Sequence, residues 1–412
     1  MAKAAFLVSM HHHQHINATL GLVAELVKRG EEVVYFFPEE FRSQIESTGA
    51  ILYPVDKNEL GIREDVEDIE ITYGIELLYN HARDILGESK RVSEIMLHKV
   101  AAVQPDYIIH DAFTLWGKHI AAYLKIPAVC TISTFAYCDA MIDKNPDMLT
   151  QYVLRLSNKD LPAKYGNNAL RTVFTALSST LKRIYHVDDL MDVFTARENL
   201  NIVATSDYFH ICREVFDDSY KFVGPTILMT CSPVEFPFEW IDGRPLIYIY
   251  VRPEFKNQYM FYTNCFEAFK DMEVQVVLSI GEKADLTKLN NIPSNILVRK
   301  QTPRIGILEK TSVFLTNEGF DDVYQALYLE VPLVTFSSAA DQSLLSRRIE
   351  ELGAGILIDK HEFTPEELRN AVIKVLNEET YKRNCRIIKE SFLAGGSFGK
   401  AADEILAYLE QA

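Results

Sequence analysis

Three carboxylates gather at the head of one predicted helix, where a phosphate-binding turn would carry glycine and hydroxyl side chains. They are Glu318, Asp321 and Asp322, in the stretch TNEGFDDVYQALYLEVPLVTFSSAADQ at residues 316–342. The pattern around them predicts a strand, this turn, a helix and a second strand, which make a βαβ unit. Such units hold anionic ligands at this turn, because the N–H groups of the helix point there. Negative side chains at this place oppose an anion.

Histidines form a second chemical cluster, directly after the first predicted strand. They are His11, His12, His13 and His15. In an extended segment His11, His13 and His15 share one side, and Asp111 at the end of a later strand adds an oxygen, so a metal site is one interpretation. A solvated or hydrogen-bonded histidine run is the other.

The size and charge of the chain limit its architecture and its partners. At 412 residues it is long enough for two domains of ordinary size. With 48% apolar and 24% charged residues, its composition is that of a globular protein. The formal net charge of -16 excludes nucleic acid and anionic membranes as expected partners, because both bind clusters of Lys and Arg.

The location is expected to be cytoplasmic. No stretch approaches the roughly 18 apolar residues of a membrane span. The apolar run near the start is too short for a secretion signal and predicts a first strand instead. The 6 cysteines lack metal-binding spacing, which indicates reduced thiols in a cytoplasmic protein.

Strands that alternate with helices along the chain predict two parallel, doubly wound sheets. In the first part, apolar runs predict strands at residues 4–9, 32–37, 51–55, 107–110, 127–132 and 202–204. In the second part, they predict strands at 246–251, 275–279, 296–299, 312–315 and 332–336. Helical patterns cover residues 17–29, 60–100, 116–124, 136–200, 365–377, 379–390 and 400–411.

The helix after the first strand positions the histidines. We expect a loop from Met10 to Ile16 and a helix from Asn17 to Arg29. Asn17 is a suitable N-cap, and Gly30 supplies the C-terminal stop.

The stretch 316–342 resembles the donor-binding segment of the family-1 glycosyltransferases, which include UDP-glucosyl, glucuronosyl and macrolide-type enzymes. That segment is usually written T-H-G-G-x-x-[ST]-x-x-E-A-L…G-V-P…P…x-D-Q. The residues that match are Thr316, Gly319, Ala326, Leu327, Val331, Pro332, Asp341 and Gln342. The resemblance implies the α/β GT-B fold, in which two Rossmann-like doubly wound domains face each other across a cleft.

On that fold, residues 1–230 form an N-terminal domain that holds the acceptor, and the proline-rich segment 231–245 is a linker. Residues 246–395 form the donor-side domain. Residues 396–412 form a C-terminal helix that crosses back to the first domain.

The resemblance also implies a catalytic pair. His15 matches the family's general-base histidine, although Gln14 replaces the preceding glycine. Asp111 matches the strand-terminal aspartate that orients this histidine and stabilises its protonated form. An acceptor hydroxyl has a pKa far above 7, and a positioned base is worth roughly 100- to 10,000-fold in rate. In the structural alternative, His15 packs in the loop and Asp111 caps the next helix.

The donor side departs from the family pattern. Asn317 replaces the phosphate-contacting histidine, and Glu318 replaces a glycine that precedes the retained Gly319. Asp321 and Asp322 replace a small residue and a hydroxyl, and Gln325 replaces the ribose-binding glutamate. One carboxylate about 4 Å from a phosphate charge costs roughly 4 kcal/mol. We therefore expect an impaired nucleotide-sugar site.

Three further donor-side residues change the chemistry. Arg252 stands in a loop of small residues, and Gln301 and Arg304 replace the uracil-stacking aromatic residue and its amide partner. The two arginines either bind an anion or pair with Glu318 and Asp322 and fill the site. We favour the pairing.

The remaining assignments also follow from the resemblance. Asp341 and Gln342 match the dipeptide that holds sugar hydroxyls. We expect no metal and no cofactor, because the family uses no metal and the UDP-sugar is a substrate. A hydrophobic acceptor suits a pocket of apolar and aromatic residues, for which we expect His13, Phe113, Phe135, Tyr137 and Met141.

The sequence thus favours an enzyme similar to glycosyltransferases, which transfers a sugar from a nucleotide sugar to a small hydrophobic natural product with inversion. One alternative is an enzyme of this fold that performs other acid–base chemistry on a small molecule without a nucleotide sugar. Another is a catalytically silent partner subunit. A homodimer and a partner enzyme are both open.

Overall fold

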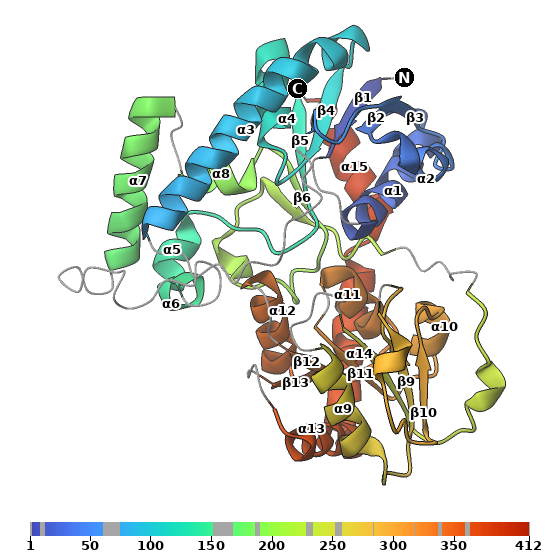
Figure 1. Cartoon of the computed structure of the whole chain (residues 1–412). Coiled ribbons are helices and arrows are strands. Elements are labelled where there is room, and N and C mark those ends of the chain that lie inside the picture. The colour runs from blue at the N-terminus through green and yellow to red at the C-terminus, as the bar shows by residue number, and fades with distance from the viewer. Residues whose placement is uncertain are drawn as a thin grey trace. The chain divides into compact units, whose positions relative to one another are not determined.

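The computed structural model describes residues 2–8, 13–60, 75–150, 168–185, 190–227, 234–251, 258–282, 284–317, 319–336, 340–358 and 363–411. The chain forms two compact units (Figure 1), which are Met1–Leu228 with Ser391–Ala412, and Met229–Glu390. Each unit is built on one parallel sheet with helices on its faces, the α/β architecture that the sequence predicts.

The first unit contains a seven-stranded sheet with the strand order β3-β2-β1-β4-β5-β6-β7. The strands are β1 (Lys3–Leu7), β2 (Glu32–Phe37), β3 (Ile51–Pro54), β4 (Tyr107–Asp111), β5 (Ala128–Ile132), β6 (Asn201–Val203) and β7 (Tyr220–Phe222). The order reverses between β1 and β4, where Leu7 lies opposite His110. In open α/β sheets, ligands bind at the carboxyl ends of the strands at such a reversal.

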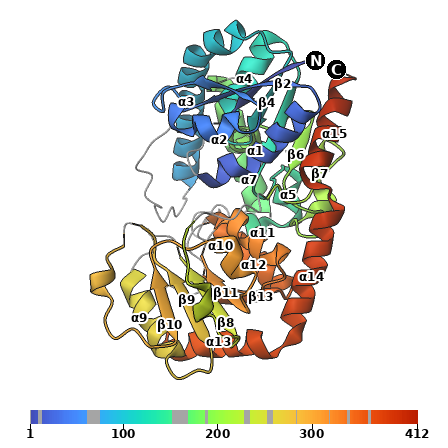
Figure 2. The same cartoon turned by 90° about the vertical axis from the view of Figure 1, so that its right-hand side faces the viewer.

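Helices cover both faces of this sheet (Figures 1 and 2). Because parallel crossovers are right-handed, α1 (His13–Lys28) lies on one face, and α3 (Ile75–Ala102) and α4 (Leu115–Leu124) lie on the other. Helix α8 (Leu190–Thr195) contacts both α3 and α4. The other helices are η1 (Glu39–Phe41), α2 (Arg42–Glu46), α5 (Ala140–Lys144), α6 (Pro146–Met148), α7 (Ala169–Tyr185) and η4 (Arg213–Val215).

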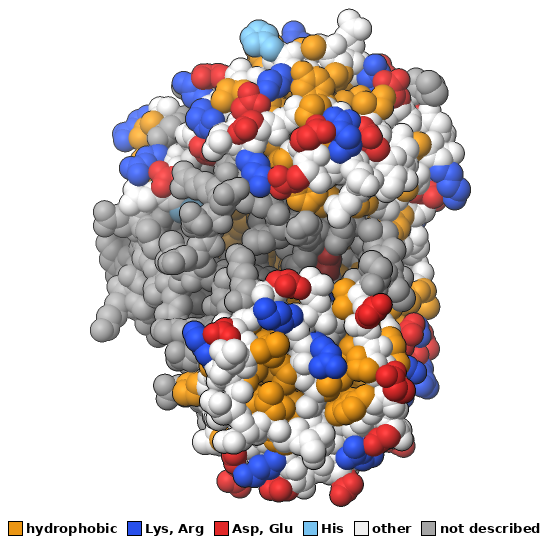
Figure 3. All heavy atoms as spheres, turned by 45° about the vertical axis from the view of Figure 1, so that its right-hand side comes forward, with side chains coloured by type: hydrophobic (Ala, Val, Ile, Leu, Met, Phe, Trp, Pro, Cys, Tyr) orange, Lys and Arg blue, Asp and Glu red, His pale blue; other side chains and the backbone are white. Residues whose placement is uncertain are grey.

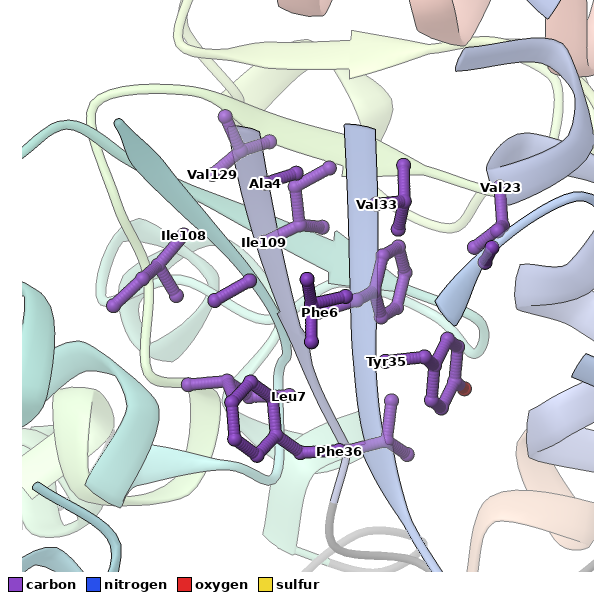
Figure 4. Close-up of a cluster of buried hydrophobic side chains, with 14 of the residues drawn as sticks. Ala4, Phe6, Leu7, Val23, Val33, Tyr35, Phe36, Ile108, Ile109 and Val129 are labelled. Carbon is purple, nitrogen blue, oxygen red and sulfur yellow. The ribbon is translucent and has the colours of Figure 1, made fainter. Parts of the chain in front are cut away.

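The core between the sheet and α1 fixes the first turns of that helix (Figure 4). The rings of Phe6 and Tyr35 stack with centroids 4.9 Å apart, and Val23 of α1 is completely buried. The hydroxyl of Thr19 donates to the carbonyl oxygen of Ile16 at 2.8 Å. That hydroxyl has one hydrogen, so the phenol of Tyr35 donates to Thr19 Oγ1, also at 2.8 Å. These bonds tie the start of α1 to β2.

The last helix, α15 (Ser397–Leu409), packs against α1. Phe398 approaches Gly21 so closely that a Cβ at Gly21 would lie 2.1 Å from its ring. Arg29 Nη2 donates to the carbonyl oxygen of Gly399 at 2.9 Å, and the same guanidinium pairs with Asp403. Apolar packing and these polar bonds together place the end of the chain on the first unit.

The second unit contains a six-stranded parallel sheet with the order β10-β9-β8-β11-β12-β13. Its strands are β8 (Leu246–Tyr250), β9 (Gln275–Ser279), β10 (Ile296–Arg299), β11 (Val313–Thr316), β12 (Leu333–Phe336) and β13 (Gly355–Ile358). The order reverses between β8 and β11, where Thr316 lies opposite Tyr250. This unit therefore also has a reversal at which a ligand site is expected.

The helices of the second unit follow the same rule of right-handed crossovers. They are η5 (Phe238–Trp240), α9 (Gln258–Phe269), η6 (Leu286–Lys288), α10 (Arg304–Leu308), α11 (Phe320–Tyr328), α12 (Ala340–Glu351), α13 (Pro365–Asn377) and α14 (Glu379–Ala394). Helix α13 packs against α9. It begins with a capping box, in which Glu367 N donates to Thr364 Oγ1 at 3.1 Å and Thr364 N donates to Glu367 Oε2 at 2.9 Å.

Surface charge is mixed on the face shown in Figure 3, where acidic and basic side chains are interspersed among apolar ones. Among the described residues, no helix is both long enough and apolar enough to cross a membrane. The five cysteines in the described ranges are free thiols: Cys130, Cys138, Cys212, Cys265 and Cys385.

Some predicted elements need correction. Strands β7 and β13 were not predicted; each lies at the edge of its sheet, and most of its residues are only half-buried, so the apolar signal is weak. The long helical region expected over 136–200 is divided in its described parts into α5, α6, α7 and α8. The linker expected at residues 231–245 stays a prediction; in that segment Asp242 N donates to Gln275 Oε1 at 2.8 Å, and Gln275 Nε2 donates to the carbonyl oxygen of Trp240 at 2.6 Å.

Candidate active site

The reversal of the first sheet brings two predicted catalytic positions to one edge. Asp111 is the last residue of β4, and His15 lies in the first turn of α1, which follows β1. Strands β1 and β4 are neighbours, so both residues follow the carboxyl ends of adjacent parallel strands. The side chain of His15 lies outside the described part of the structure. This edge has the composition of a site for proton transfer.

The carboxyl group of Asp111 is buried, with 3% of the residue exposed. Its Oδ1 accepts a hydrogen bond from the backbone N–H of Phe113 at 2.8 Å. Loss of solvent raises the pKa of Asp111 to about 6, while the Phe113 bond and the charge of His110 both act to lower it. Asp111 is therefore mostly ionised at pH 7, and it takes up a proton about one unit below.

The start of α1 differs from the sequence prediction. The expected loop extended to Ile16 with Asn17 as N-cap, but α1 begins at His13, and Asn17 lies inside it. The missed signal is Ile16, which is completely buried and extends the apolar stripe of Leu20 by one turn.

This correction also changes the metal interpretation. The backbone at His13 and His15 is helical rather than extended, so the extended segment that this interpretation assumed is absent at these two residues. His11 and His12 lie outside the described residues. Across the described ranges, no group of three or more His, Cys, Asp or Glu has the geometry of a metal site.

The residues expected to line the acceptor pocket differ widely in exposure. Phe113 is 42% exposed, whereas Phe135 and Met141 are buried, and Tyr137 is half-buried. Phe135 packs on Phe209, with ring centroids 6.1 Å apart. In this structure Phe135 and Met141 belong to the core. The side chain of His13 lies outside the described part, so the acceptor pocket stays a prediction.

A polar group that the sequence analysis did not identify lies beside Asp111. The completely buried His110 has its Nδ1 3.1 Å from the carbonyl oxygen of Asp111 and its Nε2 3.2 Å from Glu198 Oε1. Glu198 is 88 residues away in the chain. Neither periodicity nor a motif connects these residues, so only the fold reveals the pair.

In the second unit, the acidic helix start lies at the reversal between β8 and β11. Gly319 is the N-cap of α11, and Asp321 and Asp322 lie in its first turn. Asn317, just after β11, is buried. These residues therefore occupy the edge where α/β folds bind anions. Glu318 and Arg252 lie outside the described residues.

Arg304, the first residue of α10, pairs with the completely buried Asp322, while 29% of the arginine side chain is exposed. Its guanidinium carbon also lies 4.7 Å from the ring centroid of Tyr250, at the end of β8. The pairing favoured from the sequence is therefore present for Arg304 and Asp322. The guanidinium of Arg304 neutralises the charge of Asp322, and the same guanidinium contacts the ring of Tyr250.

Asp321 behaves differently from its neighbour. It is partly buried, and loss of solvent raises its pKa to about 7, although the charge of Arg304 acts to lower it. At neutral pH this carboxyl group is close to half-ionised. The negative charge in the first turn of α11 is therefore smaller than two free aspartates would give.

The other donor-side positions have varied environments. Gln301 is exposed, and Gln325 is half-buried in α11. Asp341 and Gln342 lie in the first turn of α12, and their side chains are outside the described part of the structure. The sugar-binding role expected for this dipeptide stays a prediction.

Comparison with protein families and curated proteins gives consistent matches. Residues 264–407 match the family described as "Erythromycin biosynthesis protein CIII-like, C-terminal domain". The chain is 31% identical to "Uncharacterized UDP-glucosyltransferase YojK" of Bacillus subtilis (strain 168), over 96% of this chain and 95% of the relative. It is 25% identical to "Demethyllactenocin mycarosyltransferase" of Streptomyces fradiae, over 100% of this chain and 87% of the relative.

Solved structures agree with the fold. The calicheamicin glycosyltransferase CalG4 has a TM-score of 0.76 and 24% identity, over 100% of this chain and 99% of that chain. A kitacinnamycin glycosyltransferase has a TM-score of 0.74 and 22% identity, over 98% of both chains. With two parallel Rossmann-like sheets and this full-length similarity, the chain belongs to the macrolide-type family-1 glycosyltransferases of GT-B fold.

Proposed function

We propose that this protein transfers a sugar from a nucleotide sugar to a hydroxyl group of a small hydrophobic acceptor, with inversion at the anomeric carbon. One observation carries the proposal: His15 and Asp111 follow the carboxyl ends of neighbouring parallel strands at the reversal of the first sheet. Ligands bind at such an edge. The names of two relatives, a UDP-glucosyltransferase and a mycarosyltransferase, support this class of donor and acceptor.

In this proposal His15 is the general base. As the acceptor oxygen attacks the anomeric carbon, its proton moves to the imidazole, and the bond from that carbon to the diphosphate oxygen breaks. The nucleoside diphosphate leaves with the bonding electrons. Attack from the face opposite the leaving group inverts the configuration of the sugar. The carboxylate of Asp111 stabilises the imidazolium that forms.

The protonation state of Asp111 supports this role. With a pKa of about 6, Asp111 is mostly ionised at neutral pH and is available as a counter-ion. Its bond from Phe113 N occupies Oδ1. Oδ2 is the oxygen that we assign to His15.

The donor site is altered in the same proposal. The pairing of Asp322 with Arg304 supports a weaker repulsion of the diphosphate than two free aspartates would cause, because the pair has no net charge. Asp321 is the remaining described carboxyl group, and its charge is partial near pH 7. We therefore propose that the site binds a nucleotide sugar weakly, and more tightly as the pH falls.

The test is transfer from UDP-glucose to a panel of phenolic and macrolide hydroxyl compounds. Wild-type protein should release UDP and form a glycoside of inverted configuration, assigned by NMR of the anomeric proton. His15→Ala should lower kcat roughly 100- to 10,000-fold. A product with retained configuration, or full activity in His15→Ala, would overturn the mechanism.

The Arg304–Asp322 pair also favours a second candidate, because it engages the cation that the diphosphate would otherwise bind. In that case the protein performs acid–base chemistry on a small molecule without a nucleotide sugar. Calorimetric titration would then give no heat with millimolar UDP-glucose. His15→Ala would abolish turnover of the small molecule, and Asp341→Ala and Gln342→Ala would not. A silent partner subunit would be indifferent to all three changes.

A further inference from the structure

The ring of His110 lies between two hydrogen-bond acceptors. Nδ1 faces the carbonyl oxygen of Asp111 at 3.1 Å, and Nε2 faces the carboxyl oxygen of Glu198 at 3.2 Å. A carbonyl oxygen only accepts, so Nδ1 donates. A neutral imidazole has one N–H, and therefore Nε2 can donate to an ionised Glu198 only if the ring carries a second proton.

We propose that Glu198 holds His110 as an imidazolium, and that this buried cation keeps the neighbouring carboxylate of Asp111 ionised for catalysis. The inference rests on the proposed function of Asp111. Neither Glu198 nor His110 is assigned a contact with substrate, and both act as positioning residues through Asp111.

The position of Glu198 is fixed by a buried side chain. Asn201 of β6 is completely buried, and its Oδ1 accepts from the backbone N–H of Glu198 at 2.9 Å. Its Nδ2 donates to the carbonyl oxygen of Glu198 at 2.7 Å. Both polar groups of the Glu198 backbone are therefore held by one amide. The Glu198 side chain remains 16% exposed.

The position of the His110 ring is equally restricted. A Cβ added at Gly117 of α4 would lie 2.8 Å from the Cβ of His110, so the helix packs directly on this residue. The ring has no exposed surface. It cannot turn toward water to exchange its partners without displacing α4. A buried cation in such a place needs its counter-ion, and Glu198 supplies it.

The charge of His110 acts on Asp111 in the direction that the proposal requires. Burial raises the pKa of Asp111, and the His110 charge opposes this rise. Removing that charge should therefore raise the pKa of Asp111 from about 6 toward the pH at which the enzyme works. The other titratable side chains of described residues around this group are Tyr35, Lys118, His119, Cys130, Asp192 and Arg197.

Glu198→Gln is the informative substitution. The amide of glutamine can donate to Nε2, so a neutral ring with its proton on Nδ1 keeps both hydrogen bonds. The glutamine side chain keeps the shape of the glutamate and lacks its negative charge. Asp192→Asn is the matched control, because Asp192 pairs with Lys118 and Arg197 rather than with His110.

The measurement is NMR of the full-length protein with 15N-labelled histidine and 13C-labelled aspartate carboxyl groups. The His110→Gln and Asp111→Asn spectra identify the two signals. At pH 7.5 the wild-type His110 ring should show both nitrogens protonated. In Glu198→Gln one should be unprotonated, and the Asp111 carboxyl should bind protons roughly tenfold more tightly, a shift of about one unit. Asp192→Asn should keep the wild-type behaviour.

A neutral His110 ring in the wild type would overturn the proposal, and that observation needs no variant. An unchanged Asp111 titration in folded Glu198→Gln would overturn it as well. Because these signals do not depend on turnover, absence of glycosyl transfer would count against the proposed function alone. Where transfer occurs, the acidic limb of the pH profile of kcat/KM should shift in Glu198→Gln to a pH about one unit higher, with little change in KM.

Discussion

Arg304 and Asp322 form an ion pair at the carboxyl edge of the second sheet, and the two partners differ in burial. Asp322 is completely buried, whereas the arginine side chain retains 29% of its exposure. The pair joins the first residue of α10 to the first turn of α11. Two helices at this edge of the second sheet are therefore linked by one ion pair, and loss of either partner should have a different effect on stability.

Loss of the arginine should destabilise the protein more than loss of the aspartate. Arg304→Gln leaves a buried carboxylate without its counter-ion, which we expect to lower the free energy of unfolding by about 2 kcal/mol. Asp322→Asn leaves a partly exposed arginine and should cost less than about 1 kcal/mol. Urea unfolding at pH 7.5 measures both. The double variant should resemble Asp322→Asn, and Arg244→Gln, at an exposed pair, is the control.

Nucleotide-sugar binding should depend on pH through Asp321. Its pKa of about 7 means that the negative charge of Asp321 in the first turn of α11 disappears as the pH falls. Between pH 8 and pH 6 we expect the Kd of UDP-glucose to fall roughly tenfold. UDP-glucose is the right probe because its diphosphate does not titrate in this range. Asp321→Asn should bind tightly at both pH values, while the exposed Asp271→Asn should keep the wild-type dependence.

Asp321 also links stability to pH. Its folded pKa of about 7 lies above the roughly 3.9 of an unfolded aspartate, so the folded state binds the proton more tightly. The contribution of Asp321 to the free energy of unfolding is therefore greatest below pH 4, falls between pH 4 and pH 7, and is constant above pH 7. Asp321→Asn should raise Tm at pH 8 and have little effect at pH 4, as measured by calorimetry. A lower Tm at pH 8 would contradict this sign.

Transfer activity should lose its acidic limb with Asp111. In the proposed mechanism, protonation of Asp111 near pH 6 removes the counter-ion of His15, so kcat/KM should fall below that pH. Asp111→Asn should be slower by roughly 100-fold or more at pH 7.5 and should lack this limb. A pH–rate profile from pH 5 to pH 9 measures both effects. An unchanged profile in Asp111→Asn would remove Asp111 from the mechanism.

The contact between α1 and α15 offers a test of packing by two glycines. Gly21→Ala places a methyl group inside the ring of Phe398 and should cost about 1–3 kcal/mol. Gly87→Ala, within α3, meets nothing within 4 Å and should stabilise by about 0.5–1 kcal/mol. Denaturant unfolding compares the two. Equal changes in the free energy of unfolding for the two variants would show that α15 does not pack against Gly21 in solution.

Most of the strands and the closing helices could be predicted because their patterns are local. Residues 275–279, 296–299 and 365–377 have the predicted bounds, since apolar runs and the Thr364 cap define them. The start of α1 was placed four residues too late, because Ile16 was assigned to the loop although it continues the apolar stripe of Leu20.

The candidate sites divide in the same way. The family resemblance named Asp111 as a candidate, and the structure places it at the end of β4. The pairing of Arg304 with Asp322 was one of two stated options. The bond between His110 and Glu198 had no local signal, because its partners meet only after β4, β5 and β6 assemble. Sequence patterns identify residues within one element, and charge pairs between distant elements require the fold.

The return of residues 391–412 to the first unit has a consequence for synthesis of the protein. While the ribosome is still translating residues 229–390, the nascent first unit lacks α15, and the surface of α1 around Gly21 is uncovered. That unit is complete only when α15, residues 397–409, has been translated. Premature termination near residue 390 would therefore harm the half of the molecule that was made first.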